Sequence, residues 1–225
     1  MTFISVIPAR KNSTRLKNKN LKKIEGEPLV YYSIKSSINS KYVKKTCLFT
    51  DSSELIKYAS KFPVDTDCKR PKTVSGNKIS MHATINYFIK KKKLKSSEYK
   101  YLILLQPTSP QRSSKDIDQA CKMILKDKKA DSLVSSFKLN NVQANRLMFS
   151  NGKYLILNKN KKWNKDTTVY HRNGPSIVIT KIKNITKSNL YENGKILNFV
   201  MNKNRSIDID NLDDFIKAKK KLSKK

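Results

Sequence analysis

The sequence predicts an α/β protein of three layers, in which helices cover both faces of a mostly parallel sheet. Two observations predict it: short apolar runs typical of buried strands recur along the chain, and segments with the 3.6-residue periodicity of helices alternate with them. Such alternation favours parallel strands, because each one needs a crossover connection that lies over a face of the sheet. The length of 225 residues suits a single domain spanning residues 1–225.

The first half of the chain supplies two strand–helix units. The apolar run that begins at Phe3 predicts a strand over 3–8, and a helix over 29–38 separates it from a second strand over 46–50. Ser52 and Ser53 then offer N-cap side chains for the helix that we expect next. That helix spans residues 53–62.

The second half continues the pattern. Ser113-Ser114-Lys115-Asp116 has the composition of a helix start, and the helix that it opens runs to Lys126. The remaining elements are expected as helices over 80–93 and 211–222 and as strands over 101–105, 132–137, 176–180 and 196–201.

Residues 139–170 interrupt the alternation. Polar stretches at 140–145 and 158–167 enclose a candidate hairpin around Asn151-Gly152, a dipeptide typical of tight turns. We interpret the segment as a small protruding arm or lid outside the core.

The net charge of +32 raises the question of a nucleic acid partner. Only seven of the 49 cations are arginine, the residue best suited to bidentate recognition of phosphate and guanine. The lysine runs 90–93 and 219–221 fall at predicted helix ends, as solvated charges do, and no aromatic residues interleave them. A basic RNA-binding module stays open as an alternative, but we expect no nucleic acid partner.

Other features bound the compartment and the class of protein. No apolar stretch approaches the ~18–20 residues of a membrane-spanning helix, and no basic segment precedes the first apolar run, so neither a membrane span nor a secretory signal is expected. Cys47, Cys68 and Cys121 are widely spaced and accompany only two histidines, which argues against a zinc site. Buried free thiols in a reducing cytoplasm are the simplest interpretation.

A cationic loop follows the first predicted strand, where ligands of α/β sheets bind. Residues 10–19 hold five cations, Arg10 and Arg15 among them, mixed with serine, threonine and asparagine. This composition suits a polyphosphate, although the loop is neither a P-loop nor a G-x-G-x-x-G motif. A basic surface loop is the competing interpretation, which the position after the first strand disfavours.

Two further segments carry polar groups in a restricted geometry. In Gln106-Pro107-Thr108-Ser109-Pro110, the prolines stiffen a turn that holds Gln106 after a strand. In Ser206-Ile207-Asp208-Ile209-Asp210, both carboxylates point to the same side if the segment is extended. Two converging carboxylates suit Mg²⁺, which prefers oxygen ligands and substrate phosphates. An acidic helix N-terminus is the competing interpretation, which fits Asp213 and Asp214 better.

Together these segments resemble the acylneuraminate (CMP-sialic acid) cytidylyltransferase family, over nearly the whole chain. The resemblance rests on five motifs in order: Ile7-Pro8-Ala9-Arg10 with Ser13, Arg15, Lys19 and Asn20; Thr50-Asp51 with Arg70-Pro71; Leu105-Gln106-Pro107-Thr108-Ser109-Pro110 with Arg112; Asn173-Gly174; and Ser206-Ile207-Asp208-Ile209-Asp210.

The resemblance implies a nucleotidyltransferase (Rossmann-like) sheet and a cytoplasmic enzyme of cell-surface glycan biosynthesis. CTP and a free acidic nine-carbon sugar, a nonulosonic (sialic-type) acid, would give the CMP-sugar and pyrophosphate, with Mg²⁺ or Mn²⁺ as the metal. Family members are dimers, so the arm at 139–170 is expected to cross to a second subunit. A Kdo-like, pseudaminic or legionaminic acid substrate stays open, because this chain departs from the family around residues 171–175.

The resemblance also assigns roles to individual residues. Lys19 is implied to oppose the charge that builds up on pyrophosphate. The full assignment is Arg10, Arg15 and Lys19 to the phosphates, Asn20 to the ribose, Arg70 to cytosine, Gln106, Arg172 and Asn173 to the sugar, and Asp208 and Asp210 to the metal.

Overall fold

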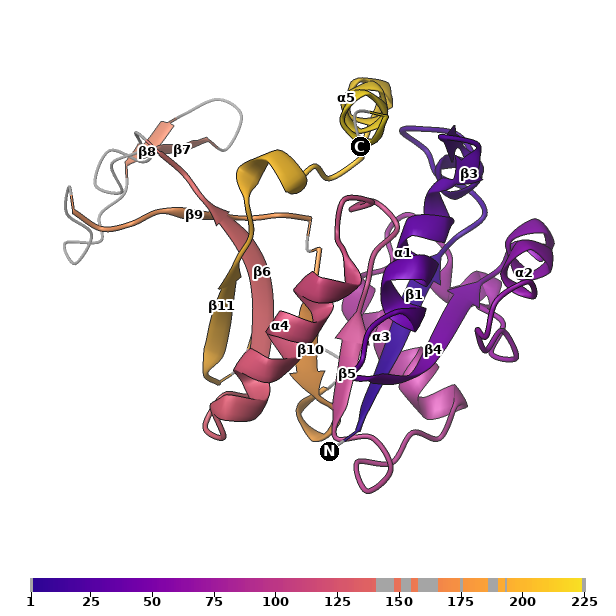
Figure 1. Cartoon of the computed structure of the whole chain (residues 1–225), viewed down its shortest axis with the longest axis horizontal. Helices are drawn as coiled ribbons and strands as arrows, with labels where there is room; N and C mark the ends of the chain where they lie inside the picture. The colour runs from indigo at the N-terminus through magenta and orange to yellow at the C-terminus, as the bar shows by residue number, and fades with distance from the viewer. Residues whose placement is uncertain are drawn as a thin grey trace.

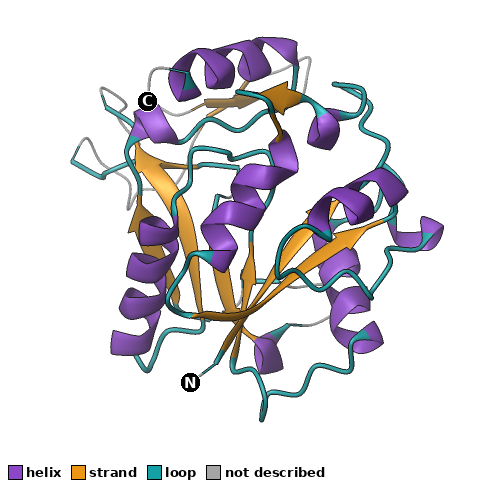
Figure 2. Ribbon diagram, turned by 45° about the vertical axis from the view of Figure 1, so that its right-hand side comes forward, coloured by secondary structure: helices purple, strands orange, loops and turns teal. Residues whose placement is uncertain are grey.

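The computed structural model contains a central seven-stranded sheet with helices on both faces (Figures 1 and 2). It describes residues 2–140, 148–150, 155–157, 166–174, 176–185, 190–192 and 194–223. The sheet has the order β11-β6-β10-β5-β1-β4, and β9 pairs with β6 at residues 136–138, beyond the part of β6 that pairs with β10.

Most strands of this sheet run in one direction, as the sequence predicts. The parallel set consists of β1 (Phe3–Ala9), β4 (Val43–Thr50), β5 (Tyr101–Leu104), β6 (Ser132–Lys138) and β11 (Ile196–Val200). Two strands oppose them, namely β9 (Tyr170–Arg172) and β10 (Val178–Lys181). A predominantly parallel three-layer fold is therefore confirmed.

The helices divide between the two faces. Those that share one buried cluster with the sheet are α1 (Leu29–Ile38), α2 (Ser53–Ala59) and α4 (Ser114–Lys126). The other face is covered by α3 (Met81–Lys91), while α5 (Leu212–Leu222) lies at the top of the molecule in Figure 1. The short elements are η1 (Lys19–Leu21), β2 (Lys23–Ile24), β3 (Glu27–Pro28), η2 (Lys72–Val74), η4 (Ile182–Asn184) and η5 (Lys203–Arg205).

The predicted helix starts are confirmed by their caps. The Ser52 hydroxyl accepts a hydrogen bond from the Leu55 amide at 3.3 Å, and α2 then ends at Ala59, earlier than the sequence predicts. Ser113 and Asp116 form a reciprocal capping box at the start of α4. Caps are local signals, since donor and acceptor lie within one turn, and the sequence reveals them for that reason.

The base of the arm belongs to the main sheet. Strand β9 pairs antiparallel with β6, and the Leu139 amide continues the ladder by donating to the Val169 carbonyl at 2.9 Å. Farther out, β7 (Met148–Ser150) pairs antiparallel with β8 (Leu155–Leu157), as expected for a hairpin. The turn around Asn151-Gly152 and much of the arm at 139–170 lie outside the described residues.

A small apolar cluster brings the two ends of the chain together. Leu16 from the first loop, Leu29 from α1, Ile209, and Ala218 from α5 are all buried in it. Ile209 is 0% exposed and lies between the two aspartates of the C-terminal segment. Burial of apolar side chains such as Leu16 and Ile209 therefore holds the cationic loop against Asp208 and Asp210.

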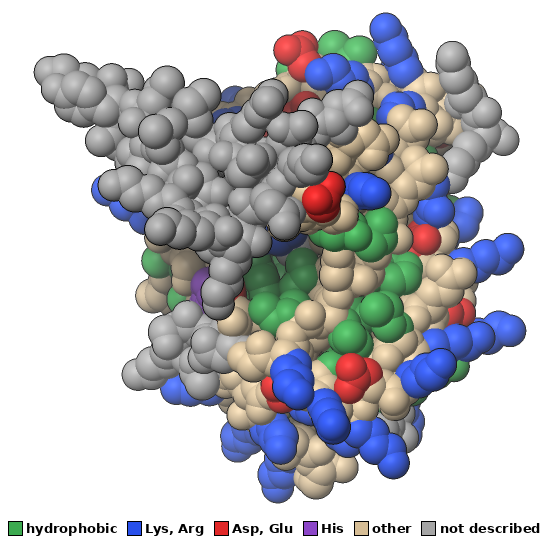
Figure 3. Space-filling model, turned by 90° about the vertical axis from the view of Figure 1, so that its left-hand side faces the viewer, with side chains coloured by type: hydrophobic (Ala, Val, Ile, Leu, Met, Phe, Trp, Pro, Cys, Tyr) green, Lys and Arg blue, Asp and Glu red, His purple; other side chains and the backbone are tan. Residues whose placement is uncertain are grey.

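Other features of the described residues agree with the composition. Lys219, Lys220 and Lys221 are exposed, and Figure 3 shows Lys and Arg side chains spread around the visible face. The three cysteines are free and buried, and burial raises the pKa of Cys47 to about 12. Within the described ranges no helix has the length and apolar character of a membrane span.

Candidate functional site

A cavity of about 340 Å³ opens beyond the carboxyl ends of β1 and β5. Its wall comes from the loop after β1, the turn after β5, the segment before α3 and the C-terminal segment ahead of α5. The lining residues are Pro8, Arg10, Ser13, Thr14, Arg15, Leu16, Lys19, Asn20, Arg70, Gly76, Asn77, Ile79, Met81, Thr84, Gln106, Pro107, Thr108, Gly174, Asp208 and Asp210. We call this space the first cavity.

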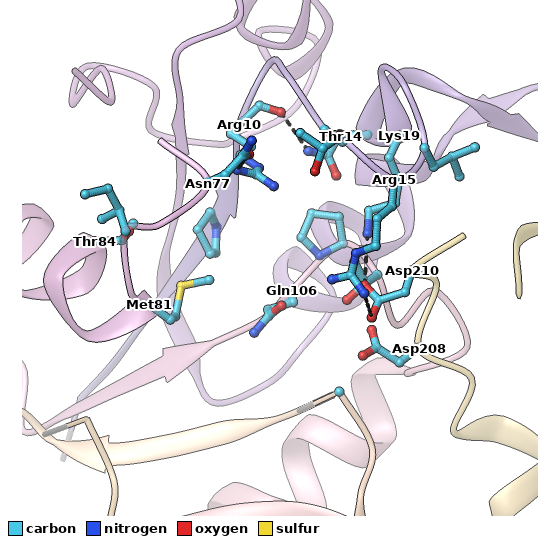
Figure 4. Close-up of a pocket in the computed structure, with 18 of the residues that line it drawn as sticks. Arg10, Thr14, Arg15, Lys19, Asn77, Met81, Thr84, Gln106, Asp208 and Asp210 are labelled. Carbon is cyan, nitrogen blue, oxygen red and sulfur yellow. Dashed lines mark hydrogen bonds and ion pairs between the residues drawn. The ribbon is translucent and has the colours of Figure 1, made fainter. Parts of the chain in front are cut away.

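The first cavity has two chemically different ends (Figure 4). Asn77, Met81 and Thr84 lie toward one side of the view, and Asp208 and Asp210 lie toward the other. Gln106 lies between the two groups. The carboxylates of the cavity therefore gather at one end, and the amide, hydroxyl and thioether side chains of Asn77, Thr84 and Met81 line the other.

Two cations at the charged end are paired with Asp210. Arg15 donates to Asp210 Oδ2 at 2.8 Å, and Lys19 Nζ lies 3.6 Å from Asp210 Oδ1. Lys19 Nζ also donates to the Ile209 carbonyl at 2.5 Å. Burial lowers the pKa of Lys19, while the carboxylates of Asp210 and Asp208 oppose that effect. The ammonium group is thus held in place with little water around it.

A hydrogen bond between Asn20 and Arg10 stabilises the cationic loop that follows β1. The Asn20 side-chain amide is buried and donates to the Arg10 carbonyl at 3.0 Å, which closes the loop on itself. The Arg10 guanidinium extends to the side chain of Asn77 and donates a hydrogen bond to it. Arg10 therefore links the cationic loop to the segment that precedes α3.

Arg70 is buried beside Thr84. Its Nε donates to the Val74 carbonyl at 2.9 Å, and its Nη2 lies 3.3 Å from the Thr84 hydroxyl. Burial lowers the pKa of Arg70 to about 10. The side chain therefore holds the 70–74 turn against α3 and leaves a further part of its guanidinium edge at the cavity wall.

The segment that carries Asp208 and Asp210 is fixed on both sides. The Ile209 amide donates to the Thr108 carbonyl at 2.9 Å, and the Asp210 amide donates to the Asp214 carboxylate at 3.1 Å. The opposite wall is Gly174, whose φ of 100° lies in the left-handed region. A Cβ there would come within 2.7 Å of the Asp208 carboxylate carbon, so only glycine leaves room for that carboxylate.

The environment of Asp208 is suited to a cation. Burial raises the pKa of Asp208 and the Asp210 carboxylate adds to the rise, whereas the Thr108 hydroxyl and Lys19 oppose it. Asp208 Oδ1 is buried and has no hydrogen-bond partner among the described residues. A buried carboxylate oxygen that has no partner in the protein is suited to bind a cation. Among the described residues, no group of three or more His, Cys, Asp or Glu side chains is arranged to hold a metal ion.

Arg112 supports the turn that holds Gln106. It is 3% exposed, and it donates to the Ser33 hydroxyl at 2.6 Å, to the Ser176 carbonyl at 2.6 Å and to the Gln106 carbonyl at 3.4 Å. Burial lowers the pKa of Arg112 to about 9. Arg112 therefore fixes the turn through its hydrogen bonds and does not itself line the first cavity.

A second cavity, of about 470 Å³, adjoins the first and shares Gly174 and Asp208 with it. Its other lining residues are Phe137, His171, Arg172, Asn173 and Ser206. The His171 ring packs on Phe137 with 5.2 Å between the ring centroids. Arg172 is exposed at the edge of the sheet on β9.

Asn173 lines the second cavity, but its amide is bonded within the protein. Its Oδ1 accepts from the Ser135 hydroxyl at 2.6 Å, and its Nδ2 donates to the Ser206 hydroxyl at 3.0 Å. The side chain is 1% exposed. Asn173 therefore joins β6 to the segment that carries the aspartates, which makes it a structural link.

The predicted site residues fall into these two adjoining cavities. The first brings together Arg10, Arg15, Lys19, Asn20, Arg70, Gln106, Asp208 and Asp210, and the second holds Arg172 and Asn173. The sequence did not mark Asn77, Thr84 and Phe137 as wall residues, because no local motif includes them. His171 lies in the segment 171–175, where the chain departs from the family that it resembles, and the fold places it at the wall of the second cavity.

Comparisons with known proteins agree with this geometry. A family model described as Cytidylyltransferase matches residues 4–220. The N-acylneuraminate cytidylyltransferase of Escherichia coli is 29% identical over 218 residues, which cover 95% of this chain and 50% of that protein. The pseudaminic acid cytidylyltransferase of Campylobacter jejuni is 27% identical over 222 residues, which cover 97% of this chain and 95% of that protein. The chain thus spans half the length of the first relative and nearly all of the second.

Solved structures show the same fold at low sequence identity. A CMP:2-keto-3-deoxy-manno-octonic acid synthetase complexed with CTP superposes with a TM-score of 0.73 at 16% identity, covering 100% of this chain and 99% of that one. The 4-diphosphocytidyl-2C-methyl-D-erythritol synthase of Anaerococcus prevotii gives a TM-score of 0.69 at 13% identity, covering 99% of this chain and 98% of that one.

Proposed function

The chain belongs to the cytidylyltransferase family, and from that premise we propose that it makes a CMP-activated nonulosonic (sialic-type) acid and pyrophosphate from CTP and the free acidic sugar. One observation carries the proposal: a cation-lined cavity and a second cavity with an exposed arginine meet at Asp208 and Gly174. Two anionic substrates bound there would meet at the shared wall.

The nucleotide is proposed to occupy the first cavity. Its base would lie near Arg70, its ribose near Asn20 and its triphosphate along Arg10, Arg15 and Lys19. The two chemically different ends of the cavity support this orientation, because guanidinium and ammonium groups form charge-assisted hydrogen bonds with phosphate oxygens. The reverse orientation would set the triphosphate against Met81 and Ile79 and away from Arg15 and Lys19.

The acidic sugar is proposed to occupy the second cavity. Arg172 suits a carboxylate because its planar guanidinium can donate two parallel hydrogen bonds. Gln106 would contact the sugar from the first cavity, near the junction. Relatives named for N-acylneuraminate, pseudaminic acid and N,N'-diacetyllegionaminic acid support an acidic nine-carbon sugar. A 3-deoxy-manno-octulosonate cytidylyltransferase that is 37% identical over 65 residues keeps an eight-carbon acid as the alternative.

The reaction needs neutralised charge and in-line alignment more than covalent catalysis. A sugar hydroxyl attacks the α-phosphorus, its proton is released, and the bond from that phosphorus to the bridging oxygen of pyrophosphate breaks. Lys19 is placed by its bond to the Ile209 carbonyl, so its ammonium can stabilise the charge that builds on the departing pyrophosphate without moving far. Arg15 adds a second cation at the same end.

Asp208 and Asp210 are the residues that would hold Mg²⁺ or Mn²⁺. Their oxygen donors and the orphaned Asp208 Oδ1 fit these cations, and phosphate oxygens of the nucleotide would add further ligands. When bound, the metal supplies Lewis-acid polarisation of the α-phosphate and eases deprotonation of the attacking hydroxyl. Asp208 lies at the wall of both cavities, which supports a metal bound at their junction.

A single assay tests the proposed function. Pyrophosphate release from CTP is measured with N-acetylneuraminic, pseudaminic, legionaminic and 3-deoxy-manno-octulosonic acids, with UTP in place of CTP as the nucleotide control. We expect release with at least one nine-carbon acid and with CTP only. Release with the eight-carbon acid alone would replace the nonulosonic substrate, and release with none of the acids would overturn the proposal. The dimer, the crossing arm and the cytoplasmic location stay predictions.

A further inference from the structure

Arg172 is supported by an aromatic ring that lines neither cavity. The guanidinium carbon lies 5.7 Å from the centroid of the Tyr191 ring, within the range of a cation–π contact. Within the described part of the chain, no carboxylate forms an ion pair with Arg172. The ring therefore orients the guanidinium without neutralising it, and the charge stays available to an anion.

Tyr191 is itself fixed from two directions. Its carbonyl accepts a hydrogen bond from the Ser132 hydroxyl of β6 at 2.9 Å, and its amide donates to the Glu192 carboxylate at 3.0 Å. That carboxylate lies 3.2 Å from Nε2 of His82 in α3. The backbone of Tyr191 is thus tied both to the central sheet and to the helix that borders the first cavity.

The ring packs on the core side and Arg172 lies over it. Tyr191 is half-buried against the apolar cluster beneath α3, so its ring cannot turn away without opening that cluster. Arg172 projects from β9, where its partner in the ladder is Ser136 of β6. A long side chain at an exposed sheet edge would otherwise sample many rotamers, and ordering it on binding costs affinity.

We propose that Tyr191 is a positioning residue for recognition of the acidic sugar. Its ring holds the Arg172 guanidinium at the second cavity, so that the sugar carboxylate meets an ordered bidentate donor. The inference rests on the proposed function, because it takes the second cavity as the sugar site. In this proposal, Tyr191 contacts no substrate and acts only through Arg172.

The test compares three variants by steady-state pyrophosphate release with the best acidic sugar of the panel. Tyr191→Leu removes the ring, Tyr191→Phe keeps it, and Tyr87→Leu removes a different ring that packs on the same apolar cluster. We expect Tyr191→Leu to raise the KM for the sugar about three- to tenfold, with the KM for CTP and kcat unchanged. Tyr191→Phe and Tyr87→Leu should keep the wild-type KM for the sugar.

A double-variant cycle checks that the effect passes through Arg172. Because Tyr191 acts on that guanidinium, Tyr191→Leu added to Arg172→Ala should raise the KM no further. Thermal unfolding confirms that each variant folds, and Tyr191→Met replaces the leucine variant if that variant does not fold.

The outcomes separate the inference from the proposed function. A wild-type protein that uses an acidic sugar while Tyr191→Leu keeps the wild-type KM would overturn the role of Tyr191 alone. So would a loss in Tyr191→Phe equal to that in Tyr191→Leu, or an equal rise in the KM for CTP. A wild-type protein that uses no acidic sugar would remove the proposed function and the inference with it.

Discussion

The two cavities differ in how their charges are held before any substrate arrives. In the first, Arg15 and Lys19 are already engaged by Asp210, and Arg70 is buried against Val74. In the second, Arg172 is exposed and rests on a ring. A ligand of the first cavity must therefore exchange one set of ion pairs for another, whereas a ligand of the second meets a cation that has no ion pair with any described residue. The contrast suits a polyanion on one side and a singly charged acid on the other.

The largest expected effect comes from removing a carboxylate at the junction. Asp210→Asn should lower kcat on the order of 10³-fold, because it deletes a proposed metal ligand while leaving the volume of the side chain nearly unchanged. Asp213→Asn is the matched control, since Asp213 is exposed in the first turn of α5. Circular dichroism and thermal unfolding should show both variants folded. A folded Asp210→Asn protein with a near-normal rate at limiting Mg²⁺ would exclude the metal assignment.

Lys19→Ala tests whether the ammonium group held in the first cavity stabilises the transition state. We expect kcat to fall roughly 10²-fold, the scale of losing one preorganised contact in the transition state. Lys17→Ala, an exposed lysine of the same loop, should leave kcat unchanged. If only the KM for CTP rises in Lys19→Ala, the lysine contributes ground-state binding. Lys19 and Arg172 would then both act on substrate binding, and the two cavities would not differ in this respect.

Arg172→Ala tests the second cavity in the same way. The KM for the acidic sugar should rise about tenfold or more, because a bidentate carboxylate contact is lost, while the KM for CTP stays close to wild type. Steady-state titration of each substrate at saturating amounts of the other measures the split. A larger rise in the KM for CTP would assign Arg172 to the nucleotide and merge the two cavities into one site.

Binding of CTP in the absence of divalent cations tests whether Asp210 competes with the nucleotide for the cations of the first cavity. Because Asp210 competes with the triphosphate for Arg15 and Lys19, Asp210→Asn should bind CTP about three- to tenfold more tightly than wild type when a chelator removes divalent cations. Isothermal titration calorimetry gives both affinities. Weaker binding by the variant would mean that the ion pairs instead order the two cations for the nucleotide.

The smallest effect concerns stability. Burial raises the pKa of Asp208, so its ionised form costs folding free energy at neutral pH. Asp208→Asn should therefore increase the unfolding free energy of the ligand-free protein by about 1 kcal/mol while abolishing turnover. As the pH falls through the raised pKa, the wild-type carboxyl gains its proton and the advantage of the variant should disappear. Denaturant melts across that range measure the difference, and a less stable variant at neutral pH would contradict it.

Local patterns in the sequence determined much of what this chain is. Hydrophobic periodicity located the helices and strands of the sheet, and Ser52 and Ser113 marked two helix starts, because those signals act within a few residues. The cationic loop and the Asp208–Asp210 pair stood out because each concentrates its chemistry in one short segment. Their convergence on one cavity followed from the rule that ligands bind beyond the carboxyl ends of parallel strands.

The tertiary structure alone decided how those groups are connected. Nothing local in the sequence reveals that β10 runs antiparallel between β5 and β6. Nor does it reveal that the Asn173 side-chain amide is hydrogen-bonded to Ser135 and Ser206, or that the Tyr191 ring lies beneath Arg172. Each of these contacts joins residues that lie between 19 and 80 positions apart. Pairings at such separations depend on how the whole chain packs, whereas propensity and periodicity report only on near neighbours.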